Sequence, residues 1–311
     1  MIYTSISDIL KQEYGQKVYR LSLQSGSTCP NRDGTIGTGG CTFCSEGGSG
    51  DFAAPLLSLD EQIAMARKKV AAKIPPSILP EERRYIAYFQ SYTNTWGDRA
   101  RLQKLYRETI RCPEICILSV ATRPDCIDDD WISFFAELNA ENPVWIELGL
   151  QTADDTIAAH VHRGYRTEIF DSAYRKLKEA GLTVITHIIL GLPDESREGM
   201  RTTVRHVKDL YDPFLSKAPD VRTDGVKLQL LHVLKGTGLY DEYNVKPFHI
   251  LTPEEYTGLI VDSLRILGQE VVIHRLTGDG PKRLLVEPEW SADKKRVLNM
   301  LTKAISDADR N

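Results

Sequence analysis

Six apolar, β-branched segments alternate along this chain with stretches of helical spacing, and this alternation constrains the fold most. The segments with strand character cover residues 18–23, 85–90, 115–121, 144–150, 182–190 and 225–232. The helices expected between them cover residues 59–73, 99–111, 131–138, 170–180 and 197–210. Strands that alternate with helices of this length predict βαβ units and a parallel sheet. With right-handed crossovers, the six units predict an α/β fold built as a partial (β/α)6 barrel.

The residues after the sixth strand predict a smaller unit. Helical patterns cover residues 253–267 and 294–307, and a short strand is expected over residues 270–275. We therefore expect a core barrel over residues 1–240. A small C-terminal α/β extension over residues 241–311 is expected to pack on it.

Composition excludes some broad classes of protein. The chain has 311 residues and a hydrophobic fraction of 41%, which supports a sizeable core. No run approaches the roughly 20 apolar residues of a membrane span, and the first residues lack the basic start and apolar stretch of a signal peptide. We expect a cytoplasmic protein whose thiols stay reduced. The net charge of −4 gives no general reason to expect nucleic-acid binding, although a local basic face would permit it.

Three cysteines lie in the glycine-rich loop that follows the first predicted strand. Eleven residues separate Cys29 from Cys41, and two separate Cys41 from Cys44. The carboxyl ends of barrel strands carry the active site, so this loop is expected at the active end. Grouped cysteines in a reducing compartment indicate metal binding or catalysis.

Ligand counting favours one kind of metal centre. A structural zinc site takes four closed ligands. Here the next cysteine is Cys112 and the first histidine is His160. Asp33 or Asp51 could complete a zinc site, although carboxylates are uncommon in structural ones. Three thiolates without a fourth ligand favour a [4Fe–4S] cluster with one iron open for chemistry. Zinc and incidental thiols remain alternatives.

The other three cysteines give a weaker signal. Cys112, Cys116 and Cys126 have irregular spacing, and Cys116 lies inside a predicted strand. Free cysteine commonly packs as a small buried hydrophobe, which we favour over a second cluster.

Together these motifs resemble the radical S-adenosylmethionine (SAM) superfamily, in the branch similar to the catalytic subunit of Elongator. The resemblance runs from about Tyr14 to about Trp290. Phe43 is the aromatic residue before the last cysteine, and a long first gap is a feature of this branch. The resemblance implies that the three cysteines hold a [4Fe–4S] cluster and that SAM chelates the open iron. Reductive cleavage of SAM would then give a 5′-deoxyadenosyl radical.

The resemblance also implies SAM contacts at successive strand ends. The implied residues are Phe43, Gln90, Ser91, Thr93, Thr122, Glu147, Gln151, Arg163, His187 and Gly191. Most relatives carry a Gly-Gly-Glu or Gly-Gly-Thr turn where this chain has Gln90-Ser91-Tyr92-Thr93. Arg163 corresponds to an arginine that faces the SAM carboxylate, and Gly191 to a glycine that lies against the adenine.

Simpler structural roles stand beside several of these assignments. Glu147 would contact the ligand or form an internal salt bridge, because a buried carboxylate needs a partner. His187 would be either a site residue or a core histidine with its hydrogen bonds satisfied. Arg163 would alternatively form an ion pair on a helix surface. Lys227 and Gln229 share one strand face and His232 takes the other. Lys235 follows in a loop, where it would meet a substrate anion or only solvent.

One subgroup of short bacterial proteins is especially similar. It shares the Cys-Pro-Asn-Arg-Asp-Gly loop, a Leu-Gly-Leu-Gln-Thr strand end and the His-Val-Leu-Lys-Gly-Thr segment of residues 232–237. The resemblance implies action on the wobble uridine of tRNA, converting a 5-carboxymethylaminomethyl group to 5-aminomethyl. It also implies an electron donor such as flavodoxin or ferredoxin. The stretch after His232 is too short for the acetyltransferase domain of the Elongator subunit beside the expected extension.

Two basic clusters bear on tRNA binding. They are Arg99, Arg101, Lys104, Arg107 and Arg111 on one predicted helix, and Lys294, Lys295 and Arg296 near the C-terminus. Such runs are usually solvated faces. Two other functions stay open: a radical SAM enzyme acting on a small metabolite or peptide, and a metal-stabilised RNA-binding protein without turnover.

Overall fold

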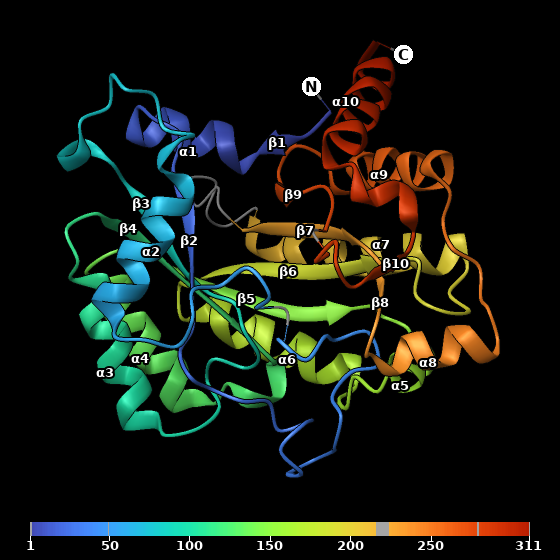
Figure 1. Ribbon diagram of the computed structural model, residues 1–311, viewed down its shortest axis with the longest axis horizontal. Coiled ribbons are helices and arrows are strands. Elements are labelled where there is room, and N and C mark those ends of the chain that lie inside the picture. The colour runs from blue at the N-terminus through green and yellow to red at the C-terminus, as the bar shows by residue number, and fades with distance from the viewer. Residues whose placement is uncertain (1, 49, 216–223, 279, 311) are drawn as a thin grey trace.

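A curled, parallel sheet forms the centre of the molecule in the computed structural model, which describes residues 2–48, 50–215, 224–278 and 280–310 (Figure 1). In the described residues the sheet has eight strands, in the order β1-β9-β7-β6-β5-β4-β3-β2. Their bounds are β1 Thr4–Ser5, β2 Tyr19–Leu23, β3 Tyr85–Phe89, β4 Ile115–Thr122, β5 Val144–Gln151, β6 Thr183–Leu190, β7 Gly225–Leu230 and β9 Val272–Arg275. Neighbouring strands are parallel throughout. The predicted α/β fold with a partial barrel is confirmed.

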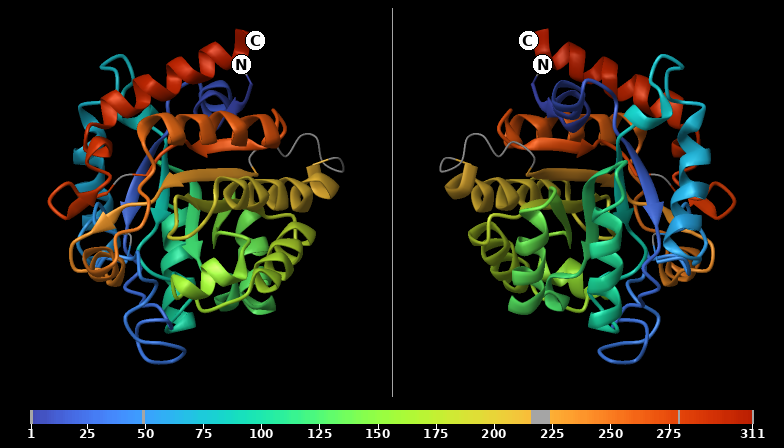
Figure 2. Two further views of the ribbon diagram at one scale, coloured as in Figure 1. Left: turned by 90° about the vertical axis from the view of Figure 1, so that its right-hand side faces the viewer. Right: turned by 90° about the vertical axis from the view of Figure 1, so that its left-hand side faces the viewer.

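Helices cover the outer face of this sheet (Figure 2). The helices are α1 Ile6–Tyr14, α2 Leu59–Ala71, α3 Arg99–Ile110, α4 Asp129–Asn139, α5 Asp155–His160, α6 Thr167–Glu179, α7 Arg197–Leu215, α8 Gly238–Val245, α9 Pro253–Leu267 and α10 Lys294–Arg310. A separate antiparallel pair joins β8 (Val233–Leu234) to β10 (Leu285–Glu287). None of the described helices has the length and apolar character needed to cross a membrane.

Local signals explain where several helices begin. The Glu61 carboxylate accepts a hydrogen bond from the backbone N–H of Ser58 at 3.1 Å, which forms a capping box before α2. Thr252 and Glu255 form the same motif before α9, with Pro253 at the first helical position. Because these signals are local, the sequence predicts both helix starts.

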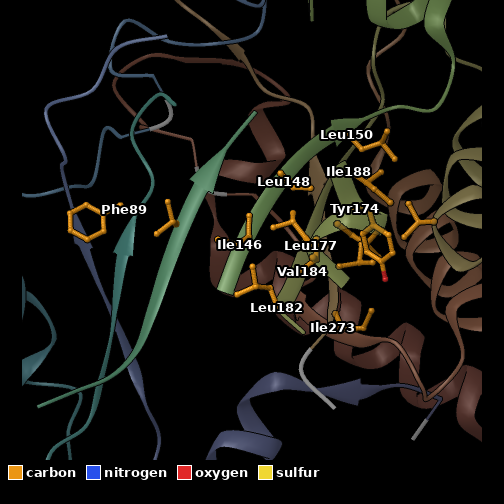
Figure 3. Close-up of a cluster of buried hydrophobic side chains, with 14 of the residues drawn as sticks. Phe89, Ile146, Leu148, Leu150, Tyr174, Leu177, Leu182, Val184, Ile188 and Ile273 are labelled. Atoms are coloured by element: carbon orange, nitrogen blue, oxygen red, sulfur yellow. The ribbon is translucent and has the colours of Figure 1, made fainter. Parts of the chain in front are cut away.

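The main core lies between the outer face of the sheet and the helices. Ile146, Leu148 and Leu150 of β5 point toward this side and are fully buried (Figure 3). Tyr174 and Leu177 of α6 lie in the same buried cluster. The intervening residues of each strand point into the barrel, because side chains alternate between the two faces of a strand. Strands buried on both faces are typical of parallel sheets covered by helices.

The sheet is larger than the sequence analysis predicts. The strand expected in the C-terminal extension is β9, and it joins the main sheet between β7 and β1 instead of lying outside the barrel. Val272 and Ile273 are both buried, and they pair with Gly225 and Val226 of β7. Burial of this apolar pair therefore ties the extension to the barrel. The proposed boundary at residue 240 stays a prediction.

Helix α1 closes one end of the barrel and has no counterpart in the sequence analysis. Its Ile6 and Leu10 pack on an apolar floor made by inward-facing residues of five strands. The floor residues are Ile86, Ile117, Trp145, Ile185 and Val272. Figures 1 and 2 place α1 at the opposite end of the molecule from the loop that carries the cysteines. The barrel interior is thus sealed at one end and available to ligands at the other.

We expect Leu10→Ala to lower the free energy of unfolding by about 2–5 kcal/mol, because it leaves a cavity between α1 and the apolar floor. The Leu10 side chain is 3% exposed. Leu298 on α10 is 41% exposed and provides the matched control, since Leu298→Ala should change stability by less than about 0.5 kcal/mol. Chemical denaturation followed by circular dichroism measures both. Equal losses in the two variants would contradict the sealing role of α1.

Candidate active site at the cysteine end of the barrel

A cavity of about 660 Å³ occupies the barrel interior and the space beneath the cysteine loop. This volume lies within the range of small-molecule sites. All three predicted cluster ligands, Cys29, Cys41 and Cys44, line it. The inner faces of the strands supply the rest of the wall.

The residues around the cysteines explain how a flexible loop adopts one conformation. Arg32 donates hydrogen bonds to the backbone carbonyls of Cys44 and Ser45, at 2.8 and 2.7 Å. Asn31 donates to the carbonyl of His162 at 2.6 Å, which ties the loop to the segment after α5. Gly40 has a φ of +81°, and a Cβ there would lie 2.7 Å from Nε of Arg32. The Cys-Pro-Asn-Arg motif therefore holds the thiols in place.

Burial and mutual repulsion make it costly for these thiols to ionise unless a cation lies near them. Burial, together with the neighbouring thiols of Cys44 and Cys29, raises the pKa of Cys41 to about 12, although Arg123 opposes this rise. Iron ions at this corner would remove the repulsion between the thiolates. In the described parts of the chain, no three His, Cys, Asp or Glu side chains converge as a single-ion site requires. Thiolates that bind different irons of one cluster need no such convergence, so the donor set fits a [4Fe–4S] cluster.

The remaining cysteines have protein contacts of their own. Cys116 is buried and its thiol contacts the carbonyl of Tyr85 at 3.4 Å. Cys112 contacts the carbonyl of Glu108, and Cys126 contacts its neighbour Asp125. These contacts fit the interpretation as packed thiols.

Most of the implied SAM-binding residues line the cavity. Those on the wall are Phe43, Gln90, Thr93, Thr122, Glu147, Gln151 and His187. Thr122 lies 2.5 Å from the hydroxyl of Thr95, and Thr95 also donates to the carbonyl of Cys126. The polar side chains after β3 and β4 are therefore fixed at the mouth of the barrel by the protein itself.

Arg163 lies behind the cavity wall and does not line the cavity. Its side chain is 1% exposed. Its N–H groups donate to the carbonyls of Leu150, Thr152 and Tyr165 and to the carboxylate of Asp155. A guanidinium with these commitments braces the end of β5 and is not a surface ion pair, and its implied contact with the SAM carboxylate stays a prediction.

Ser91 and Gly191 also lie off the wall. A Cβ on Gly50 would be 1.9 Å from the Ser91 hydroxyl, so the cysteine loop covers that side chain closely. Gly191 has a φ of +93°, and a Cβ there would lie 3.0 Å from Leu251. Contact of Ser91 or Gly191 with SAM stays a prediction, since neither residue lines the cavity in this structure.

Gln151 is held in an unusual conformation at the end of β5. Its φ is +62°, in the left-handed region that side chains other than glycine rarely adopt. Tyr165 donates to the carbonyl of Gly149 at 2.6 Å and contacts the Gln151 amide oxygen at 3.1 Å. A Cβ on Gly149 would lie 2.4 Å from the Gln151 amide nitrogen, so the absence of a side chain there lets the amide fold over the strand.

Deeper in the barrel, Glu147 is the centre of a buried polar group. It forms an ion pair with Lys227, and its carboxylate contacts Nε2 of His187 at 2.6 Å and accepts from Ser119 at 2.7 Å. Lys227 also donates to the hydroxyl of Tyr88 at 3.1 Å. Glu147 therefore forms the internal salt bridge that the sequence analysis allows, and it also lines the cavity, where its contact with a ligand stays a prediction.

The charges of this group follow from their surroundings. Burial alone would raise the pKa of Glu147, but Lys227 and His187 hold it well below its usual range. Burial and the neighbouring Lys227 lower the pKa of His187 to about 4. Neutral His187 must then donate its Nε2 proton to the ionised carboxylate.

Other charged and aromatic residues of the cavity wall are not among the predicted site residues. They include Arg20, Tyr88, Arg123, Tyr165 and Arg275. Two carry a signal in the sequence, because Arg20 precedes Ser22, and Tyr88 precedes Gln90, at the two-residue spacing of one strand face. Arg123 pairs with Asp125 at 2.7 Å and lies 4.8 Å from the centre of the Tyr165 ring, which only the folded chain reveals.

The comparisons with known proteins agree with this geometry. The Radical SAM superfamily domain matches residues 23–207, and the Radical_SAM C-terminal domain matches residues 223–307. The chain belongs to the radical SAM superfamily. It is therefore a radical SAM enzyme, of a family that uses a [4Fe–4S] cluster and SAM.

Individual relatives and one solved structure indicate the branch of the superfamily to which this chain is similar. It is 37% identical to the protein YtqA of Bacillus subtilis over 304 residues, 97% of this chain and 89% of that protein. It is 28% identical to tRNA uridine(34) acetyltransferase of Methanocaldococcus jannaschii over 177 residues, 57% of this chain and 30% of that protein. The fold of Elp3 from Methanocaldococcus infernus aligns with a TM-score of 0.59 and 18% identity, covering 90% of this chain and 63% of that one. The predicted Elongator-like branch is confirmed.

The neutral state of His187 has a consequence for stability. Because its pKa falls from 6.5 to about 4 on folding, the unfolded chain takes up a proton first as the pH drops. The contribution of neutral His187 to the free energy of unfolding is complete above pH 6.5. It is lost progressively toward pH 4, by about 3 kcal/mol in total. His187→Gln keeps a donor to Glu147 without this titration. We expect its unfolding free energy to fall less steeply between pH 6.5 and 4; identical slopes in both proteins would refute the assignment.

Proposed function

We propose that this radical SAM enzyme acts on the wobble uridine of tRNA and converts its 5-carboxymethylaminomethyl group to 5-aminomethyl. The observation that carries the proposal is the cavity that joins the three-cysteine corner to a polar, cationic barrel interior. The similarity to tRNA uridine(34) acetyltransferase supports a tRNA substrate. The subgroup motifs of the sequence support the particular side chain.

Each part of the site then has a role. Cys29, Cys41 and Cys44 would hold the cluster, which would supply the electron for SAM cleavage once a donor such as flavodoxin or ferredoxin has reduced it. The polar side chains at the strand ends orient SAM; they are Gln90, Thr93, Thr122 and Gln151, with Phe43 beside the cluster. Glu147 and His187 face the deeper part of the cavity, where the modified side chain of the uridine would lie.

The charge of the cavity suits an anionic substrate. Among the described residues, its wall carries the cations Lys17, Arg20, Arg32, Lys73, Arg123 and Arg275 and the carboxylates Asp51 and Glu147. Arg123 is already paired with Asp125, but the other described cations still outnumber these two carboxylates, although the whole chain has a net charge of −4. A cleft of one sign concentrates ligands of the other, so this local field would attract tRNA.

The basic helix of the sequence analysis is a poor tRNA surface. On α3, Arg99 pairs with Asp128 and Asp130, and Arg107 forms two hydrogen bonds with Glu137 of α4. These cations are already neutralised. The exposed cations beside the cavity mouth are better placed: Lys235 follows the lining residue Leu234, and Lys282 and Arg283 follow the lining residue Pro281.

The catalytic part of the proposal is tested by anaerobic reconstitution with iron and sulfide, followed by dithionite and SAM. We expect 5′-deoxyadenosine from the native chain and none from Cys41→Ala, because three thiolates are needed to hold the cluster. Cys116→Ala is the matched control and should retain the activity, since that buried thiol lies in β4 away from the cavity wall. One bound zinc, no cluster and no SAM cleavage would instead favour an RNA-binding protein without turnover.

The substrate part is tested with tRNA that carries the 5-carboxymethylaminomethyl group. Lys235→Gln combined with Lys282→Gln should weaken binding, and the slope of log Kd against log salt should become shallower by about one for each phosphate that the variant no longer neutralises. Lys104→Gln, on the outer face at α3, should leave the slope unchanged. Binding that barely responds to salt in the native chain, with no 5-aminomethyl product, would favour a small metabolite or peptide as the substrate.

A further inference from the structure

A layer of charged side chains crosses the barrel between the apolar floor and the cysteine end. We name it the charged layer; its residues are Arg20, Tyr88, Glu147, His187, Lys227 and Arg275. They come from β2, β3, β5, β6, β7 and β9. Glu147 lies four residues before Gln151 on the same strand face, which places the layer roughly 13 Å below the strand end.

The charges of this layer do not balance. Glu147 is its one carboxylate, and Lys227 neutralises it through a buried ion pair. Within the described residues, neither Arg20 nor Arg275 forms an ion pair with a carboxylate, although both line the cavity. Among the described residues, these two guanidinium groups therefore face the cavity without a carboxylate paired directly to either of them.

Arg20 in particular lacks partners. Among the described residues its Nε is buried and has no hydrogen-bond acceptor, and its Nη2 reaches only Nδ1 of His274, at 3.4 Å. Leaving a buried donor of a charged group unsatisfied is costly, so an acceptor supplied by a ligand would stabilise this arrangement. Burial lowers the pKa of Arg20 and neighbouring Arg275 lowers it further, although the charge of Glu147 opposes both.

We propose that Arg20 and Arg275 bind the carboxylate of the modified uridine side chain, so that the charged layer selects the carboxymethylaminomethyl form of tRNA. This inference rests on the proposed function. A guanidinium matches a carboxylate through paired, charge-assisted hydrogen bonds. The carboxylate of SAM is the other anion that could enter the cavity. A SAM molecule that chelates the open iron through its carboxylate would keep that group at the thiol corner near the strand ends, which would leave the two arginines of the layer to the substrate carboxylate.

The test compares binding of two tRNAs that differ only in the carboxymethyl group. The chain is loaded with cluster and SAM but kept without reductant, so that no turnover occurs while Kd is measured. We expect the native chain to prefer the carboxylate-bearing tRNA to the aminomethyl tRNA by about ten- to hundredfold. Arg275→Gln and Arg20→Gln should remove this preference. Arg275 has no buried, unsatisfied guanidinium atom of the kind found in Arg20, so its variant keeps the test valid if Arg20→Gln fails to fold.

Lys73→Gln is the matched control, because Lys73 is an exposed cation on the wall of the same cavity. Lys73→Gln should weaken the binding of both tRNAs equally and leave the preference for the carboxylate-bearing tRNA intact. A second readout is 5′-deoxyadenosine formed without tRNA. If Arg275→Gln raises the SAM concentration needed for half-maximal formation severalfold, the anion is the carboxylate of SAM and the inference is overturned.

The remaining outcomes separate the two proposals. If the native chain forms 5-aminomethyluridine but Arg275→Gln keeps the preference for the carboxylate, the inference fails and the proposed function stands. If the native chain neither forms that product nor distinguishes the two tRNAs, both are overturned.

Discussion

Every neighbouring pair in the main sheet is parallel, so each strand must be followed by a segment that returns outside the sheet. All strands therefore end at the same edge of the barrel. The cysteine loop after β2, the polar turns after β3 and β4 and the Gln151 end of β5 meet there for this reason. Helices on the outer face leave the inner faces free to line one cavity.

Within that barrel, polarity changes in steps along the strands. The apolar floor under α1 excludes water, the charged layer above it is partly neutralised, and the mouth carries amides, hydroxyls and thiols. The Glu147–Lys227 ion pair joins β5 to β7, with His187 of β6 between them. Removing one member would leave a buried charge unpaired, which costs more than the intact pair contributes.

The parts of the structure predicted from the sequence are those with local causes. The helix over residues 253–267 follows from its own capping residues, and the cysteine loop from its ligand spacing. The sequence predicts the C-terminal strand as part of an extension packed on the barrel, because only tertiary pairing reveals that β9 belongs beside β7. Helix α1 buries only Ile6 and Leu10 among its residues, too few to stand out before their partners are known.

The same distinction holds for the site. Gln90, Thr122 and Gln151 are predictable because a strand end is a fixed place in this fold. The surroundings of Arg163 are not predictable, because the carbonyls that accept its N–H groups belong to neighbouring segments whose conformation the sequence does not reveal. Arg20 resembles an ordinary solvated arginine in the sequence, and its shortage of acceptors emerges only when β9 and His274 close the barrel beside it.

The pairing of β1 with β9 joins the two ends of the chain at the closed end of the barrel. Thr4 lies opposite Val272, so the first strand has to wait for almost the whole chain before it finds its partner. Until then α1 has no complete floor to cover, since Val272 is part of that floor. The two ends of the chain therefore complete the same closed end of the barrel. Trimming either one would open the interior from below, on the side of the Glu147–Lys227 ion pair that ligands do not enter.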